Sequence, residues 1–84
     1  MVTESLRALP STDELLDRAS RLRADADLMD GYARRLLATA SELSACWAAP
    51  QWSRPTLEQQ AAACGTSAKQ LRTAAEALLA HSRA

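Results

Sequence analysis

The feature that most constrains this chain is an apolar side chain at every third or fourth position along two long segments. Steps of four and three from Leu15 meet an apolar residue each time as far as Trp47, and the same steps from Leu57 do so as far as Leu78. This spacing keeps one face of an α-helix apolar and is typical of the seam between two packed helices. The two segments therefore predict two long amphipathic helices.

In each segment, one of the two seam positions is alanine in every heptad. The alanines are Ala19, Ala26, Ala33 and Ala40 in the first segment, and Ala61, Ala68 and Ala75 in the second. Small side chains in register allow two helices to approach to about 8 Å, with larger side chains closing on either side. The pattern predicts a close antiparallel hairpin with an alanine-rich seam.

Prolines and capping residues mark the expected limits of the two helices. Pro10 to Asp13 has the composition of a helix start, and Pro50 and Pro55 interrupt the chain between the two segments. Because proline is excluded from helix interiors, we expect a helix over about residues 11–47, a connection over about 48–55 and a helix over about 56–82. Thr56 with Gln59 fits a capping box for the second start, and Ser53 with Pro55 is an earlier alternative. A chain of 84 residues is expected to form a single all-α domain over residues 1–84.

The composition argues against several classes of protein. Ten basic and ten acidic residues give no net charge, whereas proteins that bind nucleic acid or anionic membranes non-specifically usually carry a basic excess. No apolar run is long enough to cross a membrane, so we expect no membrane insertion. The first sixteen residues lack the pattern of a Sec signal peptide, so any export is expected to use another route.

The residues that catalysis or metal binding would need are scarce. His81 is the only histidine, and its spacing from Cys46 and Cys64 matches no zinc pattern. No phosphate-binding glycine loop and no Ser/His/Asp set is present, and the carboxylates alternate with arginines as on a solvated helix face. We therefore predict no catalytic residue, no metal and no cofactor. The two cysteines could form a disulfide or remain as thiols, and the sequence leaves both possibilities open.

Several large apolar residues lie outside the seam or at the turn. These are Leu16, Leu28, Tyr32 and Leu37 in the first segment, with Trp47 just before the connection and Trp52 within it. A chain this short buries only about 60% of its unfolded surface, so one hairpin offers little core to cover them. We expect them to contribute to an interface with a protein partner, as a homodimer or as a heterodimer with another hairpin in a four-helix bundle.

Trp47-Ala48-Ala49-Pro50, between two helical halves of similar length, resembles the turn of the WxG family of small type VII secretion substrates. The segment from Leu71 to His81 has the Leu-, Arg- and Ala-rich character of actinobacterial members, and the resemblance covers about residues 11–82. It implies dimeric four-helix bundles and secretion without a signal peptide, with the protein in the cytoplasm before export. Ala49 replaces the family's glycine. The Tyr-x-x-x-Asp/Glu export signal is missing, so the chain resembles the partner that lacks the signal.

Residues 56–73 also resemble a DNA-binding helix-turn-helix. Ala61, Gly65 and Leu71 have the spacing of that motif's small residue, turn glycine and core residue. In this alternative, Lys69, Gln70, Arg72 and Thr73 would face the major groove of the DNA. The four-three rhythm continues through Gly65 without a change of phase, which favours an unbroken helix. The conformation of residues 63–67 distinguishes the two hypotheses.

Overall fold

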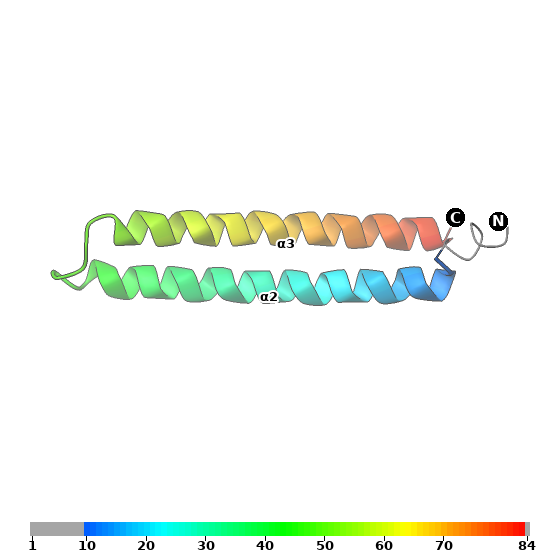
Figure 1. Ribbon diagram of the computed structural model, residues 1–84, viewed down its shortest axis with the longest axis horizontal. Helices are drawn as coiled ribbons and strands as arrows, with labels where there is room; N and C mark the ends of the chain where they lie inside the picture. Colours follow the sequence, from blue (N-terminus) through cyan, green and yellow to red (C-terminus); the bar gives the residue numbers. More distant parts are fainter. Residues whose placement is uncertain (1–9, 84) are drawn as a thin grey trace, which may run out of the picture.

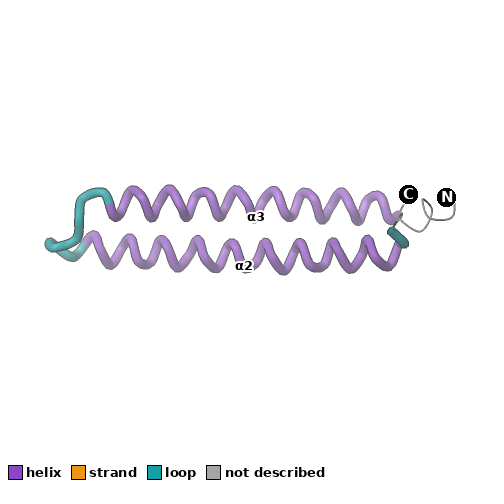
Figure 2. Tube along the Cα trace, in the orientation of Figure 1, coloured by secondary structure: helices purple, strands orange, loops and turns teal. Residues whose placement is uncertain are grey.

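The computed structural model describes residues 10–83, and these form an antiparallel hairpin of two helices with no strand. Helix α2 runs from Thr12 to Ser44 and helix α3 from Ser53 to Arg83. The helices lie side by side along their whole length in a single layer, with the connection at one end (Figures 1 and 2). The predicted all-α helical hairpin is confirmed. Residues 1–9 and 84, which belong to the predicted domain and include most of the segment searched for a signal peptide, lie outside the described residues.

The start of α2 follows from its capping residue. Ser11 has an extended backbone, and its hydroxyl accepts a hydrogen bond of 3.1 Å from the amide of Glu14. Asp13 and Glu14 add negative charge to the first turn, where the helix dipole favours it. The predicted start at Pro10 to Asp13 is confirmed.

Replacing Ser11 with alanine should lower the free energy of unfolding by about 1 kcal/mol, because one amide of the first turn loses its partner. Thermal unfolding followed by circular dichroism measures this loss. Ser20→Ala, at an exposed position in the interior of the same helix, is the matched control and should leave the melting temperature nearly unchanged. Equal losses in the two variants would mean that Ser11 does not act as a cap.

The connection between the helices is longer toward the N-terminus than predicted. Helix α2 ends at Ser44, three residues before the predicted limit at Trp47. The amides of Ala45 and Cys46 bond to the carbonyls of Glu42 and Leu43, three residues back, so the last turn tightens and the chain leaves the helix axis. The seam therefore stops at Leu43, and its predicted extension to Trp47 is wrong.

Helix α3 also begins earlier than the predicted residue 56. Its first helical hydrogen bond runs from the amide of Thr56 to the carbonyl of Trp52 at 3.2 Å. Pro55 lies in this first turn, where a missing amide hydrogen costs nothing because no intrahelical partner exists. The earlier alternative at Ser53 is thus correct, and the capping box of Thr56 with Gln59 is wrong.

The core is the alanine-rich seam. Ala26, Ala68 and Ala75 are fully buried, and Leu15, Ala19, Ala40 and Ala61 are nearly so. Among residues 10–83, no large side chain is fully buried. Apart from Leu15, the leucine, methionine and cysteine residues at the alternate seam positions remain half-buried. The hairpin thus forms its close contact through methyl groups and leaves its larger apolar side chains in partial contact with water.

Candidate protein-interaction surface

The two sides of the seam differ in chemistry, and helix geometry explains how they separate. At 3.6 residues per turn, a step of four from a buried alanine turns about 40° one way, and a step of three turns about 60° the other way. Four residues after Ala26 and Ala68 come Asp30 and Arg72, which bond to each other across the hairpin. Three residues after the same alanines come Met29 and Leu71. Charged pairs therefore lie on one side of the seam and large apolar residues on the other.

The ion-pair side is the side of the hairpin on which α2 and α3 exchange charged contacts. Arg72 donates from Nη2 to Asp27 at 2.9 Å and to Asp30 at 2.6 Å, and Arg23 pairs with Glu76 at 2.9 Å. The hydrogen bonds to Asp30 and Asp27 raise the pKa of Arg72 above its ordinary value. These pairs are largely exposed to solvent, so they align the two helices more than they stabilise them.

Replacing Arg72 with alanine should lower the melting temperature slightly in low salt, because Asp27 and Asp30 lose their common partner. Salt screens exposed pairs, so the difference from the wild type should shrink in 1 M NaCl, where the Debye length is about 3 Å. Thermal unfolding at both salt concentrations measures this. A deficit that persists in high salt would show that Arg72 contributes mainly through packing.

The leucine side is the opposite side of the seam, and eight residues define it: Leu22, Met29, Leu36 and Leu43 from α2, with Leu57, Cys64, Leu71 and Leu78 from α3. All eight are half-buried. Full burial of a leucine side chain stabilises a fold by roughly 1.5–3 kcal/mol. Because these side chains are only half-buried, the single hairpin gains only part of that free energy. The leucine side has the composition and length of one half of a helix-bundle core.

Helix α3 extends this apolar side with an uncharged surface. Five of its six Lys, Arg, Asp and Glu residues lie on the ion-pair side. Lys69, Arg72 and Glu76 lie one or four positions after a seam alanine, and Glu58 and Arg83 lie a multiple of seven residues from Arg72 and Glu76. The sixth, Arg54, lies in the first turn and pairs with Glu58 at 3.5 Å. The rest of the helix surface carries Gln, Ser, Thr, Ala and His81 beside the leucine side. Charged residues occur all around α2, so only α3 has this asymmetry.

The apolar residues that the sequence assigned to an interface are exposed, but they do not form one patch. Tyr32 lies three residues after Met29 and so flanks the leucine side, with the guanidinium of Arg35 5.8 Å from its ring centroid. Leu28, four residues before Tyr32, lies further around α2, away from the leucine side. Leu16 and Leu37 each lie a multiple of seven residues from Asp30, so they belong to the ion-pair side.

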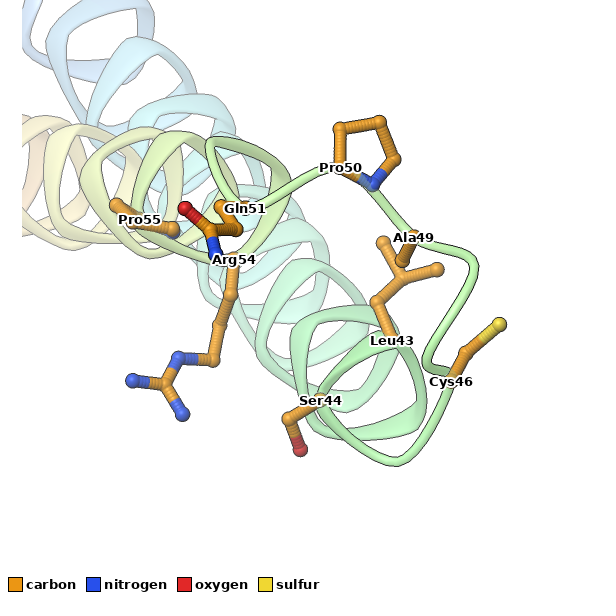
Figure 3. Close-up of a pocket in the computed structure, with 8 residues that line it drawn as sticks. All are labelled: Leu43, Ser44, Cys46, Ala49, Pro50, Gln51, Arg54 and Pro55. Atoms are coloured by element: carbon orange, nitrogen blue, oxygen red, sulfur yellow. The ribbon is translucent and has the colours of Figure 1, made fainter.

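The tip of the hairpin carries both tryptophans. Trp47 is 98% exposed and Trp52 is 68% exposed, so neither fills the end of the seam within this chain. A shallow pocket of about 240 Å³ lies between the end of α2 and the start of α3 (Figure 3). Leu43, Cys46, Pro50 and Arg54 contribute to its lining, which contains no carboxylate and no histidine.

The cysteines are both free thiols. Cys46 is exposed in the connection, whereas Cys64 lies on the leucine side, eleven residues after Ser53 and hence about 16 Å along α3. This separation along the axis explains why the hairpin does not join them.

The residues of the DNA-binding alternative lie on one continuous helix. Helix α3 passes through Gly65 without a turn, and neither described glycine has a positive φ angle. Residues 56–73 therefore do not form a helix-turn-helix. Lys69, Gln70 and Thr73 are exposed along α3, and Thr73 donates to the carbonyl of Lys69 at 3.0 Å. Arg72 is held by Asp27 and Asp30.

Within residues 10–83, no cluster of three or more His, Cys, Asp or Glu side chains could hold a metal ion. In the same part of the chain, neither helix has the length of apolar sequence that crossing a membrane requires. Comparisons of the chain with protein-family models, with curated proteins and with solved structures find no match.

Proposed function

We propose that this chain is a non-catalytic protein-interaction module that pairs with another helical hairpin in a four-helix bundle. The observation that carries the proposal is the leucine side: eight large seam residues, all half-buried, opposite a side closed by ion pairs. An amphipathic helix needs a second layer on its apolar face, and a second hairpin with a similar face would supply it.

We further propose that it acts as a WxG-like type VII secretion substrate or as the co-secreted partner of one. Three features support this: two helices of similar length, an exposed Trp47 in the connection between them, and Pro50 three residues later. The missing Tyr-x-x-x-Asp/Glu signal fits a chain that is exported together with a signal-bearing partner. In that role the protein is cytoplasmic before export and leaves by a route independent of a signal peptide.

An export experiment tests the secretion role. The tagged full-length chain is expressed together with a WxG protein that carries the Tyr-x-x-x-Asp/Glu signal, in an actinobacterial host with its type VII secretion ATPase intact or deleted, and the culture medium is assayed. We expect the chain in the medium of the intact strain only. Trp47→Ala should reduce its export, whereas Leu16→Ala, on the ion-pair side, should not. Equal amounts in the media of both strains, with a cytoplasmic marker retained in the cells, would contradict the secretion role.

A further inference from the structure

Gly65 is an interior residue of α3 that the hairpin itself does not require. Its φ angle is not positive, and a Cβ atom added to it would meet no atom of α2 within 4 Å. A glycine in a helix interior weakens the folding equilibrium about fivefold relative to alanine. Neither the backbone conformation nor packing within the chain explains the missing side chain. The space above Gly65 is therefore open to a group from outside the chain.

Leu37 lies across the hairpin from this space. Asp30 and Arg72 bond to each other at 2.6 Å, and seven residues further along α2 and seven residues back along α3 come Leu37 and Gly65. Because the helices are antiparallel, Leu37 and Gly65 take the place of that ion pair one heptad nearer the tip. Here a leucine that is 50% exposed faces a residue without a side chain.

The Gly65 notch is the hollow that Leu37, Ser41, Ala62 and Gly65 surround. Ser41 and Ala62 each follow a buried seam alanine by one position, so they form the outer edges of the hollow, and both are exposed. On each helix, the notch lies about 100° around from the leucine side. A hairpin that covered the leucine side would therefore leave the notch accessible.

Two cations lie at the end of the notch away from the tip, one on each helix. Arg34 is three residues before Leu37, and Lys69 is four residues after Gly65, so each lies about one helical turn from the hollow. Both side chains are exposed, and neither forms an ion pair with another of the residues 10–83.

The other charged groups around the notch already have partners. At the tip end, Glu58 pairs with Arg54 at 3.5 Å. At the other end, Asp27 and Asp30 both accept hydrogen bonds from Arg72. The charge that remains for an incoming group is therefore positive, and it complements a carboxylate.

We infer that the Gly65 notch binds an acidic helix of another protein, which inserts one leucine-sized apolar side chain beside Leu37. A carboxylate three or four positions away on that helix lies one turn further along, where it meets Arg34 and Lys69. The missing side chain of Gly65 supplies the room, and the exposed Leu37 supplies the apolar contact. The inference goes beyond the proposed function and does not depend on it, because the notch and the leucine side are separate surfaces.

Titration with a peptide tests the site. The probe is a synthetic helical peptide of alanine and glutamate with one central leucine and a glutamate four positions from it, added to the isotope-labelled full chain in low salt. The amide resonances of Leu37, Ala62 and Gly65 should shift, with a dissociation constant below about 1 mM. Changing the leucine to alanine, or the glutamates to glutamine, should weaken binding at least about tenfold. Equal binding of either changed peptide, or no shift at the notch, would overturn the inference.

Filling the notch is the matching change in the chain. Gly65→Leu should weaken peptide binding at least about tenfold and keep or raise the melting temperature, because leucine favours a helix and the space is open. Ala80→Leu, at an exposed position of the same helix far from the notch, is the control and should bind like the wild type. Unchanged binding by Gly65→Leu would overturn the inference.

A charge reversal tests the cations without filling the hollow. Lys69→Glu should weaken binding of the acidic peptide at least about tenfold and strengthen binding of the same peptide with lysine in place of glutamate. Leu71→Glu, which changes the leucine side, should leave peptide binding unchanged. If Leu71→Glu abolished peptide binding and Lys69→Glu did not, the peptide would occupy the leucine side, and the notch would be overturned while the proposed function would stand.

Discussion

Replacing Ala68 with leucine should lower the free energy of unfolding by about 1–3 kcal/mol, which is the usual cost of overpacking a tight contact. Ala68 is fully buried where α3 meets α2, so three added carbon atoms can be accommodated only if the helices move apart. For a domain of this size, the expected fall in melting temperature is roughly 5–20 °C.

The matched control for Ala68→Leu is Ala62→Leu, because Ala62 is exposed on the same helix and faces the ion-pair side. Both changes add the same atoms, and leucine is a good helix former, so the control should change the stability by less than about 0.5 kcal/mol. Thermal unfolding by circular dichroism compares the two variants. A similar melting temperature for Ala68→Leu and wild type would mean that the alanine seam is not a close contact.

Replacing Leu71 with glutamate should weaken the proposed pairing with a second hairpin, whether another copy or a different protein, at least about 100-fold, because a carboxylate would be buried in the bundle core without a partner. Leu71 is only half-buried in the single hairpin, so its side chain can turn toward water when the partner is absent. The variant should therefore keep its helicity and lose its dimer. Sedimentation over a range of concentrations measures the change in the dissociation constant.

Leu28→Glu is the control for this prediction, since Leu28 is exposed on α2 beyond the flank of the leucine side. It adds the same charge but should change the dissociation constant by less than about tenfold. If both variants dissociated equally, total charge rather than the leucine side would control association. If neither dissociated, another surface would form the dimer.

The hairpin was largely predictable because one repeating pattern determines it. The four-three spacing from Leu15 to Leu43 and from Leu57 to Leu78 identifies the buried face of each helix, and the alanines identify the closest contact. The continuity of α3 through Gly65 followed from the unchanged phase of the same pattern. Periodicity is a strong signal in these segments because every heptad repeats it.

The ends of the helices were less predictable because a few local hydrogen bonds determine them. Trp47 continues the apolar spacing, yet the amides of Ala45 and Cys46 bond three residues back and end the helix before it. At the start of α3, the sequence allows Pro55 to lie either in a turn or in the first turn of a helix. The hydrogen bond from the Thr56 amide to the Trp52 carbonyl shows that it lies in the first helical turn. Local hydrogen bonds of this kind leave no periodic pattern in the sequence.

The separation of the seam into two chemically different sides was not predicted, because the apolar residues were considered without the charges. Leu28, Tyr32, Leu16 and Leu37 stand out as exposed apolar side chains, but they lie on different sides of the hairpin. The more informative signal was the heptad position of each charged residue in α3. Sorting those positions would have identified the uncharged surface of α3, although the cross-hairpin pairs of Arg72 and Arg23 need the register of the folded chain.

The most direct test of the central claim, that another helical hairpin covers the leucine side, is the mass of the wild-type chain in solution under reducing conditions, alone and after purification from its host. Sedimentation equilibrium from low micromolar to several hundred micromolar should give a mass of about twice the chain mass of 9.1 kDa, as a homodimer of the chain alone or as a complex with a co-purified hairpin. A mass that stays at 9.1 kDa over the whole range, with helicity intact and no hairpin protein co-purifying, would contradict the account.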